Sequence, residues 1–311
     1  MLNISVIIPN YNYGRYLRQA IDSALGQTLP PHEVIVVDDG STDNTDEILA
    51  DYQDRIKVAR QQNQGVATAR NKGAGIATGD LLGFLDSDDV WLPTKLELQV
   101  KRFLAEPDLG LVHCGVLNID SDGVPLEKRV DGMEGWVALE MLRFRKSVVI
   151  APGSASLIPR SVFEEVGGYD TDRRLHPSED WDLSYRIACS HKIGFVPEVL
   201  IHYRQHGKND HLNIRAMEQA MMLAYAKAFA RANFQLRRIQ RECYGNLHMV
   251  LAGCYYTNTQ PYDFVRNLLK GLWLAPATVS RPLGFPLRRL RRSRLLGKMS
   301  NLFGRSTSNT P

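Results

Sequence analysis

The stretch Leu81-Leu-Gly-Phe-Leu-Asp-Ser-Asp-Asp-Val-Trp-Leu-Pro93 decides the fold of this chain. Five mostly apolar residues lead directly into three carboxylates within four positions, Asp86, Asp88 and Asp89. An apolar run of this length, bounded by polar residues, predicts a buried strand. The acidic residues then lie at its carboxyl end, which is the edge where open α/β sheets bind their ligands.

Two interpretations of the three carboxylates are open at this point. Crowded carboxylates repel one another unless a cation neutralises them, and oxygen ligands at an exposed edge suit a hard divalent ion that also holds phosphates. One Asp would be enough to cap the helix expected after Pro93. Three acidic residues directly after a buried strand favour the metal site.

The preceding residues repeat the same strand–helix unit. Apolar runs predict strands at residues 4–8, 33–38 and 55–59, each followed by a helix, the last of them over residues 65–77. Four such units in about ninety residues predict a parallel, doubly wound α/β sheet. Polar clusters follow the first, second and fourth strands, so we expect them to meet at one sheet edge.

The later pattern predicts further elements and a change of architecture. Up to residue 204 we expect helices at 94–104, 136–144 and 159–166, a turn at 120–123, and strands at 110–118, 155–158, 192–195 and 199–204. Helices then follow at 213–235, 237–257 and 261–275. We therefore expect an α/β domain over 1–210, a helical appendage over 211–280 and a basic, partly disordered tail over 281–311.

Charge is unevenly distributed along the 311 residues. The net charge is +4, but residues 281–311 alone carry eight Lys or Arg and no acid, which leaves −4 for the remainder. Leu283, Leu287 and Leu290 would share one face of an interfacial helix, although Pro282 and Pro286 oppose a regular helix there. Because basic tails bind lipid head groups or nucleic acid, we expect contact with an anionic membrane surface.

Cysteine spacing and hydropathy indicate the compartment. The four cysteines form no Cys-x-x-Cys pair, as is typical of buried thiols in a reducing compartment. The first residues enter a strand pattern at once, so we expect no signal peptide. No stretch offers about 18 uninterrupted apolar residues for a membrane span. We expect a cytoplasmic protein, in peripheral contact with the inner face of the membrane.

Five motifs in order carry a family resemblance: Ser5-Val-Ile-Ile-Pro-Asn-Tyr-Asn12, Asp38-Asp-Gly-Ser-Thr-Asp43, Ala69-Arg-Asn-Lys-Gly73, Leu85-Asp-Ser-Asp-Asp89 and Ser178-Glu-Asp-Trp-Asp182. Over residues 1–210 the chain resembles the family-two glycosyltransferases. The resemblance implies a GT-A fold, a Rossmann-like and mostly parallel sheet flanked by helices. It also implies inverting transfer of a sugar from a nucleotide diphosphate to an acceptor hydroxyl, assisted by Mn²⁺ or Mg²⁺.

The resemblance assigns a nucleotide site to Pro9, Tyr11, Asp39, Arg70 and Asp86. Tyr11 would stack on the base and Asp39 would accept a hydrogen bond from a uracil imide, which favours a UDP-sugar. Arg70 would reach the base or a phosphate, Pro9 would offer a backbone contact, and Asp86 would hold the ribose. Without the resemblance, Tyr11 would equally well be a packing residue, Asp39 a turn residue and Arg70 a solvated helix charge.

The same resemblance assigns the metal and the catalytic base. Asp88 would bind the metal directly, Asp86 would hold it or its water, and His206 would bind the metal or a phosphate oxygen. Asp89 would mainly cap the following helix. Asp180 would be the base that takes the acceptor's proton, with Glu179 supporting it. Spacing alone would favour helix capping for Asp180.

Three function classes are weighed on these grounds. The first is a glycosyltransferase acting on a glycan or a lipid-linked glycan. The second is a nucleotidyltransferase, although Pro9 to Gly14 lacks the Gly-rich phosphate loop that such an enzyme should show. The third is a non-catalytic nucleotide- or nucleic-acid-binding protein, which the acidic body and Asp180 oppose, so nucleic acid is not the expected partner.

Overall fold

The computed structural model describes three segments of the chain, residues 2–207, 213–231 and 234–278. The chain divides into two compact units, Met1–Met141 with Lys146–Ala224 and Leu142–Arg145 with Tyr225–Pro311. The division between these units falls inside helix α9 (Ile214–Ala230), and the domain boundary expected at residue 210 stays a prediction. The predicted basic tail, 281–311, lies outside the described residues.

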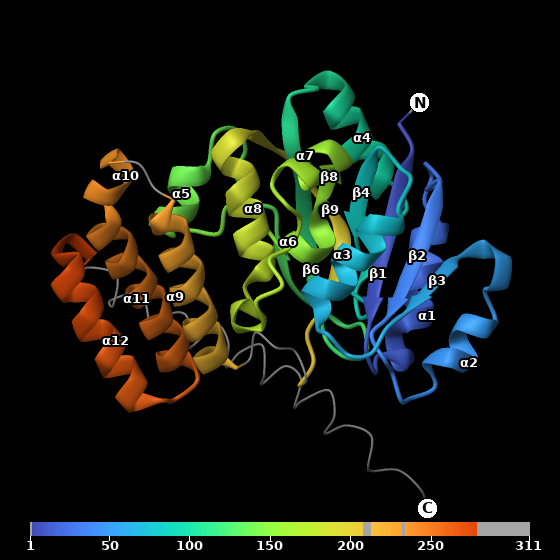
Figure 1. The fold of residues 1–311 in the computed structure, drawn as a ribbon. Helices are drawn as coiled ribbons and strands as arrows, with labels where there is room; N and C mark the ends of the chain where they lie inside the picture. The colour runs from blue at the N-terminus through green and yellow to red at the C-terminus, as the bar shows by residue number, and fades with distance from the viewer. Residues whose placement is uncertain (1, 208–212, 232–233, 279–311) are drawn as a thin grey trace, which may run out of the picture. The chain divides into compact units, whose positions relative to one another are not determined.

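One mixed sheet organises the first unit (Figure 1). Its strands are β1 (Ile4–Asn10), β2 (Glu33–Asp38), β3 (Lys57–Arg60), β4 (Leu81–Phe84), β5 (Val90–Trp91), β6 (Leu109–Ile119), β7 (Pro125–Arg129), β8 (Leu157–Pro159) and β9 (Lys192–Arg204). They lie in the order β3-β2-β1-β4-β8-β6-β9-β5, with β7 on β6. Strands β1 to β4 are parallel to one another, as the sequence predicts, whereas β8 is antiparallel to both of its neighbours.

The two predicted closing strands are one strand, β9. Its pairing with β6 slips between Val196 and Val199, so Pro197 and Glu198 bulge out of the ladder. Proline lacks the N–H that a ladder needs, and a bulge absorbs it without ending the strand. The expectation of a break at this position is therefore wrong, although both halves are extended.

Some helices flank the sheet of the first unit, and others form the second unit. They are α1 (Gly14–Leu25), α2 (Thr45–Ala50), α3 (Val66–Ile76), α4 (Lys95–Ala105), α5 (Ala138–Arg143), α6 (Pro152–Ala155), α7 (Arg160–Glu165), α8 (Glu179–Ser190), α9, α10 (Phe234–Arg238), α11 (Gln240–Thr257) and α12 (Pro261–Leu274). Most predicted helices are confirmed to within a few residues. The helix predicted over 213–235 ends at Ala230 instead.

Alternation along β1 explains why helices cover both faces of the sheet. Val6 and Ile8 belong to a buried cluster with Leu17 of α1 and Leu96 of α4. Ile7 points to the opposite face, where a Cβ on Gly73 of α3 would lie 2.4 Å from its side chain. Successive strand residues face opposite sides, so a uniformly apolar β1 needs cover on both. The sheet is doubly wound, as predicted.

In the second unit, α11 and α12 pack closely side by side (Figure 1). Met249 and Ala252 are buried and contact Tyr256, Phe264 and Leu268. A Cβ on Gly271 would lie 2.6 Å from the Met249 sulfur, so glycine is what permits this approach. Within the described segments no helix is both long and apolar enough to cross a membrane.

Candidate functional site

The carboxyl ends of β1, β2 and β4 line a cavity of about 540 Å³. Seven of the eight predicted site residues line it, namely Pro9, Tyr11, Asp39, Arg70, Asp86, Asp88 and Asp180. Parallel strands share one carboxyl edge, so residues that follow different strands converge there. The predicted meeting of the polar clusters at one sheet edge is confirmed.

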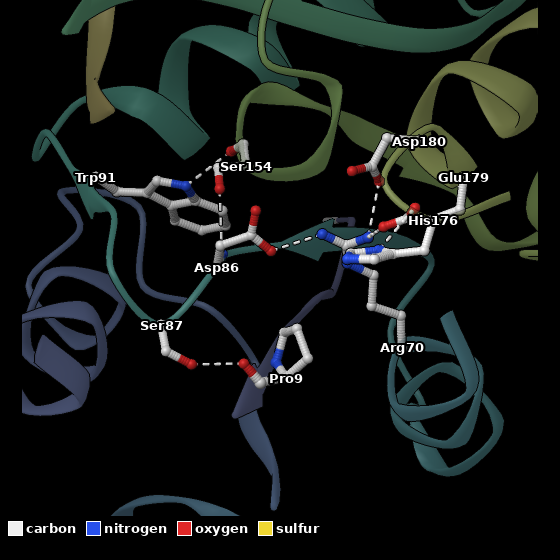
Figure 2. A network of polar contacts seen from close by, with 9 residues as sticks. All are labelled: Pro9, Arg70, Asp86, Ser87, Trp91, Ser154, His176, Glu179 and Asp180. Atoms are coloured by element: carbon white, nitrogen blue, oxygen red, sulfur yellow. Dashed lines mark hydrogen bonds and ion pairs between the residues drawn. The ribbon is translucent and has the colours of Figure 1, made fainter. Parts of the chain in front are cut away.

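Arg70 lies at the centre of a carboxylate cluster (Figure 2). Its guanidinium is 2% exposed and donates to Asp86 at 2.6 Å, to Asp180 at 2.9 Å and to Glu179 at 3.3 Å. Arg70 comes from α3, and the two acids at 179 and 180 begin α8. Because the buried guanidinium forms ion pairs with all three acids, it fixes the positions of their carboxylates. Contact of Arg70 with the nucleotide stays a prediction.

The carboxyl group of Asp180 has a strongly shifted pKa. Burial and the nearby charges of Glu179 and Asp86 raise this pKa, the Arg70 guanidinium and a hydrogen bond from Tyr169 lower it, and the net result is a pKa of about 7. Glu179 responds in the opposite direction, because hydrogen bonding to His176 and the charge of Arg70 lower its pKa despite burial. Neighbouring carboxyls with diverging pKa values are typical of acid–base sites.

Asp88 pairs with His206 on another part of the site. His206 Nε2 lies 2.9 Å from Asp88 Oδ2, and its ring stacks on Tyr16 with 5.4 Å between centroids. Asp86, the other predicted metal ligand, instead bonds Arg70. In the described part of the chain, no group of three or more His, Cys, Asp or Glu side chains is placed to hold a metal ion. Asp88 and His206 are the two predicted metal ligands that the structure brings into direct contact.

Asp39 organises the loop that leads into α3. Its carboxylate accepts hydrogen bonds from Gln61 Nε2 at 2.7 Å and from the backbone N–H groups of Gln64 and Gly65 at 2.8 Å each. Two carboxylate oxygens offer about four acceptor positions, so one further donor can still be accommodated. Tyr11 is 44% exposed at the cavity wall. Both positions are compatible with contact to a nucleobase.

The backbone of Pro9 makes a contact within the protein, and its predicted contact with the nucleotide stays a prediction. Its carbonyl accepts a 2.5 Å hydrogen bond from the hydroxyl of Ser87, which lies between Asp86 and Asp88 (Figure 2). This bond ties the end of β1 to the acidic loop after β4. This link holds the loop that carries Asp86 and Asp88 in place relative to strand β1.

Asp89 does not cap the next helix, contrary to the prediction. Strand β5 intervenes, and α4 begins after Thr94. Asp89 is 1% exposed and accepts the backbone N–H of Arg204 at 2.8 Å, which joins the acidic loop to the end of β9. Burial and the charges of Asp88 and Asp86 raise its pKa well above the usual range. A partner 115 residues away has no local signature in the sequence.

Sequence reasoning missed several site residues in or near its least patterned region, 120–155. A Cβ on Gly153 would lie 2.9 Å from Arg70 Nη2 and from Asp180 Oδ2, so only glycine fits there. The Ser154 hydroxyl accepts the backbone N–H of Asp86 at 3.1 Å (Figure 2). The Pro-Gly-Ser run at 152–154 was the one local signal in this region.

Two histidines received no role from the sequence. His176 lies 3.3 Å from Glu179. His211 is outside the described residues.

Comparison with solved structures identifies the fold class. The chain superimposes on the crystal structure of S. aureus TarS 1-349 in complex with UDP-GlcNAc with a TM-score of 0.63 and 16% identity, over 99% of this chain and 93% of that one. It also matches the mannosyltransferase PcManGT from Pyrobaculum calidifontis in complex with GDP-Man and Mn²⁺, with a TM-score of 0.59 and 20% identity over 98% and 88%. The fold is that of the GT-A glycosyltransferases.

Sequence comparison names the family. Residues 5–167 match the family model described as Glycosyl transferase family 2. An uncharacterized glycosyltransferase of Nostoc sp. is 36% identical over 219 residues, which cover 68% of this chain and 67% of that protein. A Bacillus subtilis protein named for teichuronic acid biosynthesis, TuaG, is 41% identical over 135 residues, 42% of this chain and 53% of its own length. The chain belongs to glycosyl transferase family 2, and among the three classes weighed it is a glycosyltransferase.

Proposed function

We propose that this chain is an inverting glycosyltransferase that uses Asp180 as its base. The observation that carries the proposal is the position of Asp180 on the cavity that Tyr11, Asp39 and Asp88 also line, with its pKa raised to about 7. A base of that pKa is divided between its two protonation states near neutral pH, so it can both take and release a proton. A structural helix cap would need no such environment.

In the proposed reaction, the Asp180 carboxylate lies on the face of the donor sugar opposite the leaving diphosphate. Asp180 takes the proton of the acceptor hydroxyl as the acceptor oxygen forms its bond to the anomeric carbon. The bond between that carbon and the diphosphate oxygen breaks, and the electron pair leaves with the nucleotide diphosphate. A single displacement inverts the anomeric configuration. Arg70 holds the Asp180 carboxylate in place through its 2.9 Å hydrogen bond.

The leaving-group side of the site is proposed at Asp88 and His206. A carboxylate and an imidazole fit a Mn²⁺ or Mg²⁺ ion that completes its coordination with phosphate oxygens, since such ions often bind through few protein ligands. When bound, the ion would neutralise charge on the departing diphosphate. Asp86 forms an ion pair with Arg70 and would contact the ribose of the nucleotide.

The donor is proposed to be a UDP-sugar and the acceptor a glycan or lipid-linked glycan. The donor proposal is supported by the acceptor capacity left on Asp39 and by the UDP-GlcNAc bound to the structural neighbour TarS. The acceptor proposal is supported by the name of TuaG. The eight Lys and Arg of residues 281–311 support contact with an anionic membrane, where lipid-linked acceptors lie.

A donor screen tests the proposed function. Thermal stabilisation and donor turnover would be measured for UDP-, GDP- and dTDP-sugars, with Mn²⁺ and with chelator. UDP-sugars should raise the melting temperature only with the metal present, and Asp88→Ala should abolish that shift. Asp46→Ala, which removes an exposed carboxylate paired with Arg60 outside the cavity, is the matched control and should leave it unchanged.

Each part of the proposal has its own opposing result. Turnover of GDP-sugars but not UDP-sugars would overturn the donor assignment alone. Full stabilisation by a UDP-sugar in chelator would exclude the metal site at Asp88 and His206. A product with retained anomeric configuration, read by NMR, would exclude the single displacement at Asp180.

A further inference from the structure

Helix α12 of the second unit exposes an apolar stripe. Tyr262 is 79% exposed, Val265 47%, Leu269 61% and Trp273 71%. Their spacing of three, four and four residues places them within an arc of about 80° on a helix with 3.6 residues per turn. The stripe is the face of α12 turned away from α11, because Phe264, Leu268 and Gly271 pack against α11.

Four large exposed apolar side chains in one row require an explanation. Scattered exposed hydrophobic residues are ordinary, but a contiguous row marks an interaction surface. Its composition is specific, because Tyr and Trp stand at the two ends with aliphatic residues between them. Amphipathic aromatic rings are enriched where hydrocarbon meets lipid head groups.

Cations border the stripe. The Arg241 guanidinium lies 5.3 Å from the centre of the Trp273 ring and Lys270 is exposed beside Leu269, whereas Arg266, one turn earlier, is paired with Asp263 at 3.1 Å. The segment around the stripe is also basic. Residues 225–311 contain fifteen Lys or Arg and two acids, a net charge of +13. The remainder of the chain therefore carries −9.

We propose that the apolar stripe of α12 inserts into the interface of an anionic lipid membrane. An apolar face flanked by cations is the pattern of a helix that lies in the membrane plane. A second copy of the chain is a poorer partner, because residues 225–311 carry a net charge of +13 and two copies of this segment repel each other. The proposal adds a described surface to the membrane contact proposed for residues 281–311, and it does not depend on the transfer reaction.

Vesicle binding by the full chain tests the proposal. The probes are phosphatidylcholine vesicles with and without 30% phosphatidylglycerol, and the readout is the fraction of protein that sediments with them. We expect binding to the anionic vesicles only. The double change Leu269→Ala and Trp273→Ala should lower the partition coefficient at least tenfold.

A matched control exists in the first unit. Leu104 and Trp136 are 68% and 65% exposed, so Leu104→Ala with Trp136→Ala makes the same chemical change elsewhere and should leave binding unchanged. Insertion has its own spectroscopic readout, because brominated acyl chains quench only tryptophans that reach them. Quenching should be lost in Trp273→Phe, a change that keeps an aromatic ring, and retained in Trp136→Phe.

Three results would overturn the proposal. Anionic binding that is unaffected by the α12 double change would assign membrane contact to residues 281–311 alone. Binding without quenching of Trp273 would mean attraction by charge without insertion. A dimer in sedimentation velocity that Trp273→Ala dissociates, with no vesicle binding, would assign the stripe to a second copy of this chain.

Discussion

Asp180 combines two requirements that conflict in most surface carboxylates. It must be accessible to the acceptor, and its side chain is 20% exposed; it must also hold a proton near neutral pH. Arg70 alone would lower its pKa, but burial and the neighbouring Glu179 and Asp86 outweigh that effect. The balance of these contributions gives the proposed base its raised pKa.

Removing the base while keeping its shape separates chemistry from binding. Asp180→Asn should reduce transfer by about three orders of magnitude, in the range that loss of a general base produces. The amide is nearly isosteric, so the donor's dissociation constant should change less than threefold. Isothermal titration with the donor and a transfer assay measure the two quantities. Equal loss of both would mean that Asp180 has a structural role.

The pH dependence of transfer follows from the raised pKa of Asp180. The base acts when deprotonated, so kcat/KM should rise with pH through about 7 and level off above it. Glu179→Gln removes a negative charge that raises this pKa, so the rising limb should move to lower pH. If the midpoint of the rise in kcat/KM were unchanged in Glu179→Gln, a group other than Asp180 would control the pH dependence.

At the scale of elements, the short helix α6 supports the reacting groups. Its Gly153 lies against Arg70, Asp86 and Asp180, and its Ser154 carbonyl accepts the Trp91 indole N–H at 2.9 Å. Gln99 of α4 donates to the next carbonyl, at Ala155. These bonds to the buried core fix α6, so the cluster above it has little freedom to shift.

Adding one methyl group to α6 tests this arrangement. Gly153→Ala would place a Cβ 2.9 Å from two charged atoms of the cluster, so it should lower kcat at least tenfold while the protein stays folded. Gly75→Ala in α3 is the control, because nothing lies within 4 Å of its added Cβ and helix propensity should stabilise it. The two variants would be compared by steady-state kinetics and thermal melting. Wild-type kcat in Gly153→Ala would contradict the role of α6.

His113 holds the segment before α6 onto strand β6. Its Nε2 lies 3.0 Å from the Met133 carbonyl, its Nδ1 accepts the Ile150 N–H at 3.3 Å, and its ring stacks on Phe195. Both nitrogens are used by the neutral ring. Burial accordingly lowers the pKa of His113 to about 4.

This histidine predicts an acid limit on stability. Above pH 6.5 His113 is neutral in the folded and the unfolded chain, so its ionisation contributes nothing to the pH dependence. Between about pH 6.5 and 4 only the unfolded chain binds the proton, which should cost up to about 3 kcal/mol of unfolding free energy. Urea unfolding at pH 7 and pH 4.5 measures the loss. A loss of the same size in His113→Gln would assign it to other groups.

At the scale of the molecule, every described site residue belongs to the first unit. The second unit has its own packing between α11 and α12, where Met249 is 1% exposed. The proposed site residues thus lie in one unit, and the other unit carries the apolar stripe and a net positive charge.

This separation predicts independent stability and activity. Met249→Ala should lower the unfolding free energy of the second unit by about 2–5 kcal/mol, the usual cost of a buried Met→Ala change. Below the new transition temperature, the donor's dissociation constant should equal that of the wild type. Calorimetry and donor titration at 20 °C measure the two effects. A parallel weakening of donor binding would show that the units depend on each other.

The pattern of apolar residues was enough to predict the first four strands and the sheet edge at which their polar residues meet. Runs such as Ile4–Ile8 and Leu81–Phe84 are apolar because both faces of a parallel sheet are buried. Short loops between strand and helix then force the carboxyl ends to one edge, so the sequence alone places Tyr11, Asp39 and Asp86 at the same sheet edge. The family resemblance added the roles of Asp88 and Asp180.

Only the tertiary structure decided how those residues are held. Arg70 reads in the sequence as a helix charge, yet it is buried among acids 16 to 110 residues away. Asp89 reads as a cap, yet it joins the end of β9. The physical reason is range: apolar periodicity and capping are local properties of the chain. An ion pair or a glycine contact such as that of Gly153 exists only once distant segments have packed together.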